Sequence, residues 1–160
     1  MSARDAGCGA ASFTRRRLLQ GAGALAVVGC IPARAADGAL PAIPAMDAYL
    51  AGRVPRRERV RLDLPRLADN GLAVPMRIVV AGPFAPGPYV RAIRLFSEIN
   101  PVPVMAVFEF PLPIERVEID ARIRLAGTQQ VVAIAEMTDG DLCAAATEVV
   151  VTLAGCMDGT

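Results

Sequence analysis

Apolar and polar residues alternate along most of the chain after residue 56, and this period of two predicts β-strands. The clearest case is residues 117–125, where five apolar side chains occupy the odd positions and four charged side chains occupy the even positions. We expect this strand to face a core on one side and water on the other. Residues 131–137 form an apolar run, which is typical of a central strand covered on both faces.

Breaks rich in proline, glycine and asparagine divide this pattern into about seven strands. The breaks fall at residues 65–71, 82–88, 100–103, 111–113 and 138–141. Asn70 and Gly71 favour a left-handed turn in the first of them. The predicted strands are residues 60–64, 74–81, 89–96, 104–110, 117–125, 131–137 and 143–153. Their number and spacing predict an all-β, immunoglobulin-like antiparallel β-sandwich.

The rest of the chain divides around this predicted sandwich. Residues 1–35 have the composition of an export signal, and residues 36–56 form a lead-in with a short helix predicted at Pro44–Leu50, ending near Gly52. The sandwich itself is predicted at residues 57–153. Residues 154–160 are predicted to form a mobile C-terminal arm.

Residues 1–35 combine the three parts of a bacterial export signal. Arg15 and Arg16 lie in a basic run, a weakly apolar stretch follows at residues 21–31, and small side chains at Ala33 and Ala35 suit signal peptidase. Paired arginines before a short apolar stretch fit the twin-arginine route. The stretch is far shorter than the roughly 20 residues of a membrane-spanning helix. We therefore expect export to the periplasm without a membrane span.

Cleavage after Ala35 would leave 125 of the 160 residues, with 12 basic and 15 acidic side chains and a net charge of −3. This charge argues against nucleic acid as a partner. A second cleavage site competes with the first, because the residues before Cys30 resemble the lipobox of bacterial lipoproteins. Cleavage before Cys30 would tether the domain to a membrane, but the soluble product is the favoured interpretation.

The chain contains no histidine. This excludes the commonest general base, the Ser-His-Asp and Cys-His catalytic arrangements, and most types of zinc site. A self-sufficient hydrolase or haem protein is therefore disfavoured, and we expect no resident cofactor or metal.

Cys143 and Cys156 are the two cysteines that remain after removal of residues 1–35. Cys143 begins the last predicted strand and Cys156 follows its end, so a straight strand would separate them by roughly 30 Å at about 3.3 Å per residue. A disulfide needs Cα atoms within about 7 Å. Cys143 is therefore interpreted as a small buried side chain.

Cys156 lies in the predicted arm, whose seven residues reach at most about 23 Å when fully extended. Gly155 and Gly159 make the arm pliable, because glycine accepts backbone angles that other residues avoid. A thiolate can hold a group covalently and release it by exchange or hydrolysis. The arm carries no base or metal ligand of its own, so chemistry on a carried group must come from other proteins. We therefore predict a covalent carrier that is not an enzyme, with Cys156 as its attachment site.

Three charged residues inside the predicted strands are further candidates for a functional role. Arg122 and Arg124, on the polar face of residues 117–125, have an anion-binding interpretation, although a solvated charged face is the commoner explanation of this pattern. Glu136 interrupts the apolar run at residues 131–137. A buried carboxylate and an edge or interface position explain it equally well.

Several segments together resemble the SoxY family of sulfur-oxidation carrier proteins. They are Leu62–Pro65, Ala68–Gly71, Val74–Pro75, Tyr89–Val90, Asn100–Pro101, Arg122–Ala126, Thr128–Gln129, Ala133–Met137, Asp139–Gly140 and Gly155–Cys156. The resemblance implies that Cys156 carries thiosulfate-derived sulfur on a swinging arm and that the domain pairs with a SoxZ-like β-sandwich subunit. It also implies that periplasmic enzymes act on the adduct in turn: a c-type cytochrome, a metal-dependent hydrolase and a sulfane dehydrogenase.

The arm departs from the family pattern Gly-Gly-Cys-Gly-Gly. Here Ala154 precedes Gly155, and Met157 and Asp158 follow the cysteine. Ala154 and Met157 make the arm stiffer and bulkier, and the Asp158 carboxylate disfavours both the thiolate and an anionic adduct. Two interpretations stay open: a carrier of the SoxY type, serving thiosulfate or another sulfur compound, and a non-catalytic interaction module in which Cys156 is incidental or forms a disulfide between subunits.

Overall fold

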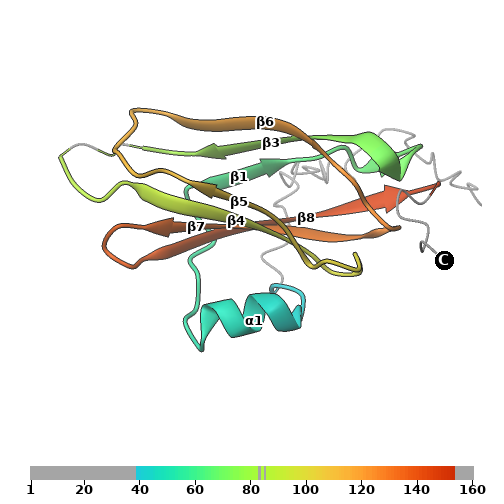
Figure 1. Ribbon diagram of the computed structural model, residues 1–160, viewed down its shortest axis with the longest axis horizontal. Coiled ribbons are helices and arrows are strands. Elements are labelled where there is room, and N and C mark those ends of the chain that lie inside the picture. Colours follow the sequence, from blue (N-terminus) through green and yellow to red (C-terminus); the bar gives the residue numbers. More distant parts are fainter. Residues whose placement is uncertain (1–38, 83, 85, 154–160) are drawn as a thin grey trace, which may run out of the picture. The chain divides into compact units, whose positions relative to one another are not determined.

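Two β-sheets pack face to face in the computed structural model, which describes residues 39–82, 84 and 86–153 (Figure 1). One sheet has the strand order β1-β3-β6 and the other the order β2-β8-β7-β4-β5. All strand pairs are antiparallel except β2 with β8. The strands are β1 (Val60–Asp63), β2 (Leu67–Ala68), β3 (Val74–Val80), β4 (Val90–Ser97), β5 (Val104–Glu109), β6 (Val117–Ile123), β7 (Gln129–Met137) and β8 (Leu142–Val151). The predicted immunoglobulin-like β-sandwich is confirmed.

The main core lies between the two sheets and is built by the alternation in the sequence. On β3, for example, Val74, Met76, Ile78 and Val80 are buried, while Pro75 and Arg77 between them are exposed. Inward side chains of β4, β7 and β8 meet this face from the five-stranded sheet. Burial of the apolar surface from both sheets is the main favourable term for such a fold.

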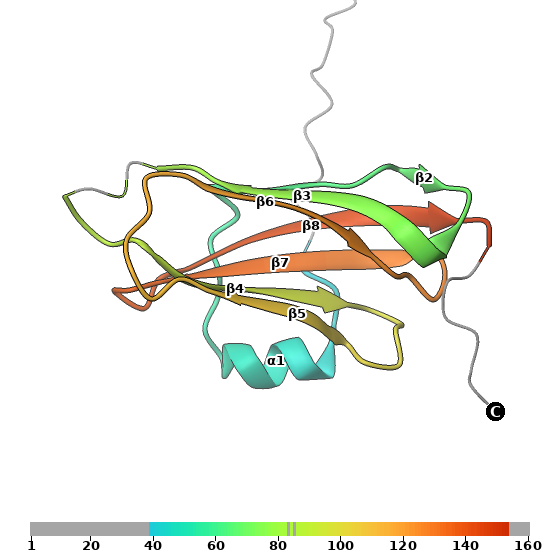
Figure 2. The same cartoon turned by 45° about the horizontal axis from the view of Figure 1, so that its top comes forward.

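A second core lies on the other face of the five-stranded sheet, beneath the helix α1 (Pro44–Leu50), as Figures 1 and 2 show. Pro44 suits the first helical position because its missing N–H is not needed there. The helix ends as predicted, with Ala51 and Gly52 in left-handed conformations. Its buried side chains pack against Phe96 of β4, Val132 and Ile134 of β7, and Leu142 and Ala144 of β8.

Strand β7 is covered on both of its faces, as its apolar run predicts. Its inward residues join the core between the sheets, and its outward residues Val132 and Ile134 lie under α1. All seven residues from Val131 to Met137 are buried. The hairpin from β7 to β8 also forms at the predicted position, where Gly140 has a left-handed φ of 91°.

The first predicted break differs from the structure in two ways. Residues 65–71 contain the two-residue strand β2, so the described residues form eight strands where about seven were predicted. The predicted left-handed turn at Asn70 and Gly71 is wrong, because Asn70 is extended (φ −141°) and its side-chain oxygen accepts a hydrogen bond from the Leu72 N–H. This bond caps a short 3₁₀ helix, η1 (Gly71–Ala73).

Strand β6 alternates as predicted, but the middle of its apolar face is not fully covered. Val117 and Ile123 are buried, whereas Ile119 and Ala121 between them are half-buried. The reason is that β6 is an edge strand, paired only with β3. Among the described residues, no helix is both long enough and apolar enough to span a membrane.

Candidate functional site

The residues predicted to carry the function lie outside the described part of the chain. These are Cys156 with Gly155 and Gly159 in the C-terminal arm, and Arg15 and Arg16 in the predicted export signal. What the structure describes is the end of the sandwich from which the arm continues, together with the surfaces around it.

The C-terminal end of β8 is held on both sides by hydrogen bonds. On one side, the Gly71 N–H donates to the Leu153 carbonyl (2.8 Å) and the Thr152 hydroxyl donates to the Asp69 carbonyl (2.7 Å). On the other side, the Val151 N–H donates to the hydroxyl of Thr128 (3.0 Å). The strand is therefore fixed up to the residue before the predicted arm.

A side-chain network fixes the loops at the same end of the sandwich. The Asn100 amide nitrogen donates to the Arg124 carbonyl (2.8 Å), and its oxygen accepts from the Ala126 N–H (2.9 Å) and from the buried Gln129 side chain (2.8 Å). Gln129 in turn accepts from the Ile99 N–H (3.2 Å). Because its polar groups are paired, this network holds the β4–β5 and β6–β7 connections against each other.

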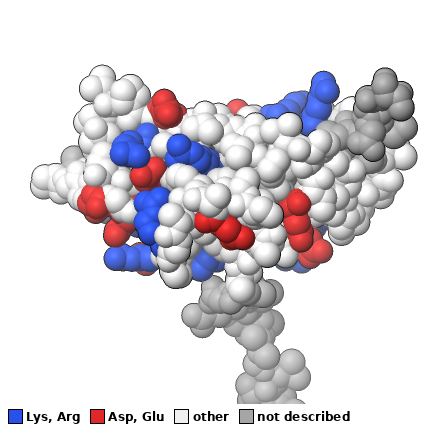
Figure 3. Space-filling view, turned by 60° about the horizontal axis from the view of Figure 1, so that its bottom comes forward, with Lys and Arg blue, Asp and Glu red and all other residues white. Residues whose placement is uncertain are grey.

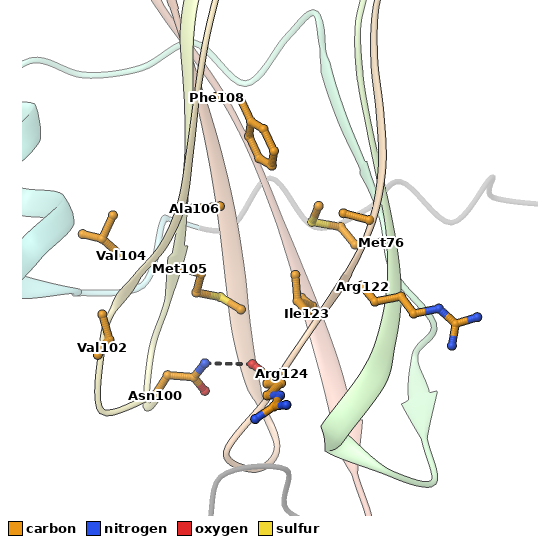
Figure 4. A pocket seen from close by; sticks show the side chains of 11 residues that line it. Met76, Asn100, Val102, Val104, Met105, Ala106, Phe108, Arg122, Ile123 and Arg124 are labelled. Atoms are coloured by element: carbon orange, nitrogen blue, oxygen red, sulfur yellow. Dashed lines mark hydrogen bonds between the residues drawn. The ribbon is translucent and has the colours of Figure 1, made fainter.

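An apolar groove of about 420 Å³ opens between β5 and β6, the edge strands of the two sheets (Figure 4). The side chains of Met105 and Phe108 on β5 point toward those of Met76 on β3 and Ile123 on β6. Its lower rim is formed by the Asn100 network. This rim adjoins the fixed end of β8, since the Gly71 carbonyl accepts a hydrogen bond from the N–H of Leu125 (2.8 Å).

The two predicted anion-binding arginines do not converge on this groove. Arg122 and Arg124 are exposed, and Figure 4 shows the Arg122 guanidinium directed away from the groove. Neither residue has an ion pair within the described part of the chain. On the molecular face shown in Figure 3, basic and acidic side chains are interspersed, with uncharged surface between them. The described residues contain no group of three or more His, Cys, Asp or Glu suited to a metal.

Glu136 is a buried carboxylate, one of the two interpretations that the sequence left open. It lies on β7 beside α1 and accepts hydrogen bonds from the Tyr49 hydroxyl (2.8 Å), from Arg91 (2.8 Å) and from Arg94 (3.5 Å). The Arg94 guanidinium also lies 4.3 Å from the centre of the Tyr49 ring. Burial by itself raises the pKa of Glu136, but the Tyr49 hydroxyl and the neighbouring guanidinium groups outweigh it, so the pKa lies below its ordinary value.

Cys143 is a buried thiol at the start of β8, as predicted, with 2% of its surface exposed. It forms no disulfide, and burial raises the pKa of its thiol. The Arg56 carbonyl accepts from the Ala144 N–H (2.8 Å), so the lead-in segment covers this part of the β8 edge. Such a thiol is a poor nucleophile because little of it is ionised near neutral pH.

A comparison with protein families matches residues 46–156 to the model described as sulfur oxidation protein SoxY. The chain belongs to the SoxY family. The match begins within α1, covers all eight strands and ends at Cys156. Membership of this family indicates a role in sulfur oxidation, as the resemblance implied.

The structure of the sulfur carrier protein SoxY from Chlorobium limicola f thiosulfatophilum is similar to that of this chain. The two are 26% identical, with a TM-score of 0.55 over 66% of this chain and 87% of that one. This likeness supports a carrier role within sulfur oxidation for this SoxY-family chain.

The structures of superoxide reductases are less similar to that of this chain. The enzyme from Ignicoccus hospitalis is 17% identical, with a TM-score of 0.46 over 59% of this chain and 80% of that one. A putative superoxide reductase from Thermotoga maritima is 15% identical, with a TM-score of 0.48 over 60% and 87%. Likenesses at this level carry no argument about function. No curated protein sequence matches the chain.

Sequence reasoning missed two features of this SoxY-family domain. The groove was not predicted, because it depends on where two distant edge strands lie relative to each other. The partners of Glu136 were not predicted either, although an acidic residue within an apolar run is the signal that marks such a buried cluster.

Proposed function

We propose that this chain is a periplasmic carrier that holds thiosulfate-derived sulfur covalently on the thiol of Cys156 and presents it to sulfur-oxidising enzymes. The observation that supports this most directly is the extent of the family match, which runs through the whole sandwich and ends at Cys156. The fixed end of β8 supports it too, because a covalent carrier benefits from a rigid base next to its attachment point.

The two cysteines differ in a way that favours Cys156 as the attachment site. Cys143 is buried and its pKa is raised, so it is unsuited to attack a sulfur compound. Its position also disfavours an internal disulfide. Eight residue steps along β8 separate Cys143 from Val151 by about 26 Å, and the five residues from Val151 to Cys156 span at most about 18 Å. The remaining gap exceeds the roughly 7 Å that a bridge allows.

The proposed loading step requires an oxidant. Joining the Cys156 sulfur to the outer sulfur of thiosulfate forms one S–S bond and releases the thiol proton and two electrons. The SoxY resemblance implies a c-type cytochrome as the electron acceptor. Water then cleaves the terminal S–S bond of the adduct, releasing sulfate and leaving a persulfide on Cys156, and the resemblance implies a separate metal-dependent hydrolase for this step. A sulfane dehydrogenase would oxidise the sulfur that remains.

We further propose that the domain is exported by the twin-arginine route and pairs with a SoxZ-like sandwich subunit. Mass spectrometry of the purified N-terminus tests the export signal: a start at Ala36 supports it, and a lipidated Cys30 contradicts the soluble form. Replacement of both Arg15 and Arg16 by lysine should retain the precursor in the cytoplasm.

Mass analysis of the thiols tests the carrier role directly. After incubation with thiosulfate and an extract of sulfur-oxidising cells, the protein should gain a sulfur-containing adduct that a reductant removes. The adduct should persist in Cys143→Ser and be absent from Cys156→Ser. An unmodified Cys156 thiol after this treatment would contradict the proposal. A covalent dimer on a non-reducing gel that disappears in Cys156→Ser would favour the interaction module instead.

A further inference from the structure

A second apolar pocket, separate from the groove between β5 and β6, lies at the C-terminal end of α1. Its volume is about 400 Å³, which is within the range of small-molecule sites. Buried Leu50 lines it from the helix, and half-buried Leu40 lines it from the segment before the helix. Val54 and Pro55 line it from the segment after the helix. The walls of the pocket are therefore mainly aliphatic.

The segment after α1 is held in place, although most of its side chains are exposed. The Arg53 N–H donates to the Leu50 carbonyl at the end of the helix (2.9 Å). The Arg56 N–H donates to the Leu142 carbonyl on β8 (2.8 Å). Val54 lies between these two hydrogen bonds, and 90% of its surface is exposed. Because Val54 lines the pocket, its exposed surface extends the aliphatic wall outward.

One fixed guanidinium group borders this pocket. The Arg53 side chain donates to the backbone carbonyls of Tyr49 and Leu50 (3.2 Å each), and its guanidinium carbon lies 5.6 Å from the centre of the Tyr49 ring. These partners hold the group in one position but leave its charge unneutralised, because they carry no net charge. A guanidinium that is already fixed loses less conformational entropy when it binds an anion.

A second guanidinium group borders the pocket without an acidic partner among the described residues. Arg57 is exposed and forms no ion pair with them, whereas its neighbour Arg56 pairs with Glu58 (3.5 Å) and Asp141 (3.1 Å). None of the described residues that line the pocket is acidic. An anion bound by Arg53 and Arg57 therefore meets two positive charges and no competing carboxylate among these residues.

We propose that this pocket binds a small organic anion. The aliphatic body of the ligand contacts Leu40, Leu50 and Val54. Its head group, a carboxylate or sulfonate, binds Arg53 and Arg57. Aliphatic walls with a few convergent polar groups are typical of small-molecule sites. Arginine suits the head group because its planar fork donates two parallel hydrogen bonds to oxygens of this geometry.

The ligand of this pocket is not the sulfur group proposed on Cys156. Arg56 bridges to Cys143 near the start of β8, so the segment that lines the pocket lies at the opposite end of this strand from Val151 (Figure 1). Cys143 and Val151 are about 26 Å apart along the strand. The arm and its proposed adduct reach at most roughly 15 Å from Leu153. The pocket is therefore independent of the carrier role.

Titration of the purified protein with hexanesulfonate, followed by the methyl signals in NMR spectra, tests the site. The signals of Leu40, Leu50 and Val54 should shift in a saturable way, while those of Ile123 in the groove between β5 and β6 should not. Hexanol, which has the same chain without the charge, should bind at least about tenfold more weakly. Inorganic sulfate, which lacks the chain, should not saturate the site at the same concentrations.

A matched pair of arginine substitutions tests the head-group contact. Arg57→Gln keeps most of the side-chain length and removes the charge, so it should weaken hexanesulfonate binding about three- to tenfold and leave hexanol binding unchanged. Arg66→Gln is the control, because Arg66 is also exposed and has no ion pair with a described residue, but it lies next to β2. It should change the affinity by less than about twofold. Circular dichroism confirms that both variants are folded.

Several outcomes would overturn the proposal. They include equal affinity for hexanesulfonate and hexanol, equal weakening by Arg57→Gln and Arg66→Gln, and methyl signals that do not saturate. Vesicles of phosphatidylglycerol that bind the protein through Arg57, without saturable binding of hexanesulfonate, would overturn it in favour of a membrane surface. Cys156→Ser should bind hexanesulfonate as the wild type does, so failure of the carrier proposal and failure of this one are measured separately.

Discussion

Replacement of Glu136 by glutamine tests how α1 is held on the five-stranded sheet. Glutamine keeps the size of the side chain and removes its charge. The Glu136 carboxylate accepts one hydrogen bond from Tyr49 of the helix and two from arginines of β4. Hydrogen bonds to charged groups contribute about 1.5–3 kcal/mol each when buried, but the Arg91 side chain is 63% exposed and its ion pair contributes less than about 1 kcal/mol. We expect Glu136→Gln to lower the free energy of unfolding by about 2–3 kcal/mol.

Urea denaturation at pH 7, followed by circular dichroism, measures this loss. Glu148→Gln is the control, because Glu148 is exposed on β8 and has no ion pair in the described part of the chain. Its substitution should change the free energy of unfolding by less than about 0.5 kcal/mol. Equal effects of the two substitutions would refute the assignment of Glu136 as the residue that holds the helix.

The pH dependence of the free energy of unfolding provides a second check on Glu136. Because the folded-state pKa of Glu136 lies below its ordinary value, its contribution is fully present above the unfolded value of about 4.3. It is lost as the pH falls from there through the folded-state pKa. The stability difference between wild type and Glu136→Gln should therefore narrow between pH 5 and the acid limit of folding. A difference that stays constant over this range would contradict the charge-based explanation.

Other substitutions test the second core, the loop network, the hairpin and the buried thiol. Met46→Ala, which empties space under α1, should cost about 2–5 kcal/mol in urea denaturation. Asn100→Ala should cost about 1–3 kcal/mol, because it leaves the buried Gln129 amide without one of its partners. Gly140→Ala should lower stability by about 1–2 kcal/mol through its left-handed φ alone, since an added Cβ meets no atom within 4 Å. In Cys156→Ser, the remaining Cys143 thiol should react with iodoacetamide only in denaturant, and fast labelling of the native protein would contradict its burial.

The parts of the fold that follow from local patterns could be predicted from the sequence. Alternation on β3 and β6, the unbroken apolar run on β7 and the turn at Gly140 are all signals within a few residues of one another. The position of α1 could also be predicted from local signals, because a proline at its start and a glycine just after its end mark both termini. The prediction that β7 is covered on both faces holds because α1 supplies the second layer.

The parts that were missed depend on contacts between distant segments. Strand β2 is too short to show a period and exists because it pairs with Val150 and Val151, more than 80 residues later. The turn preference of Asn70 and Gly71 is overridden by bonds that tie Gly71 to Leu153 and Leu125. Cys156, the residue that matters most for the proposed chemistry, lies outside the described residues, so its role stays a prediction.

If Cys156 carries sulfur as proposed, the hydrogen bonds that fix Leu153 limit which enzymes can act on it. Cys156 follows Leu153 by three residue steps, which extend the backbone by at most about 11 Å. With the cysteine side chain and the proposed adduct added, the reach from Leu153 is at most roughly 15 Å. A catalytic centre deeper than this, at the bottom of a channel too narrow for the sandwich, is out of reach. The proposed carrier role therefore predicts partner enzymes with shallow active sites or with entrances wide enough to admit one end of the domain.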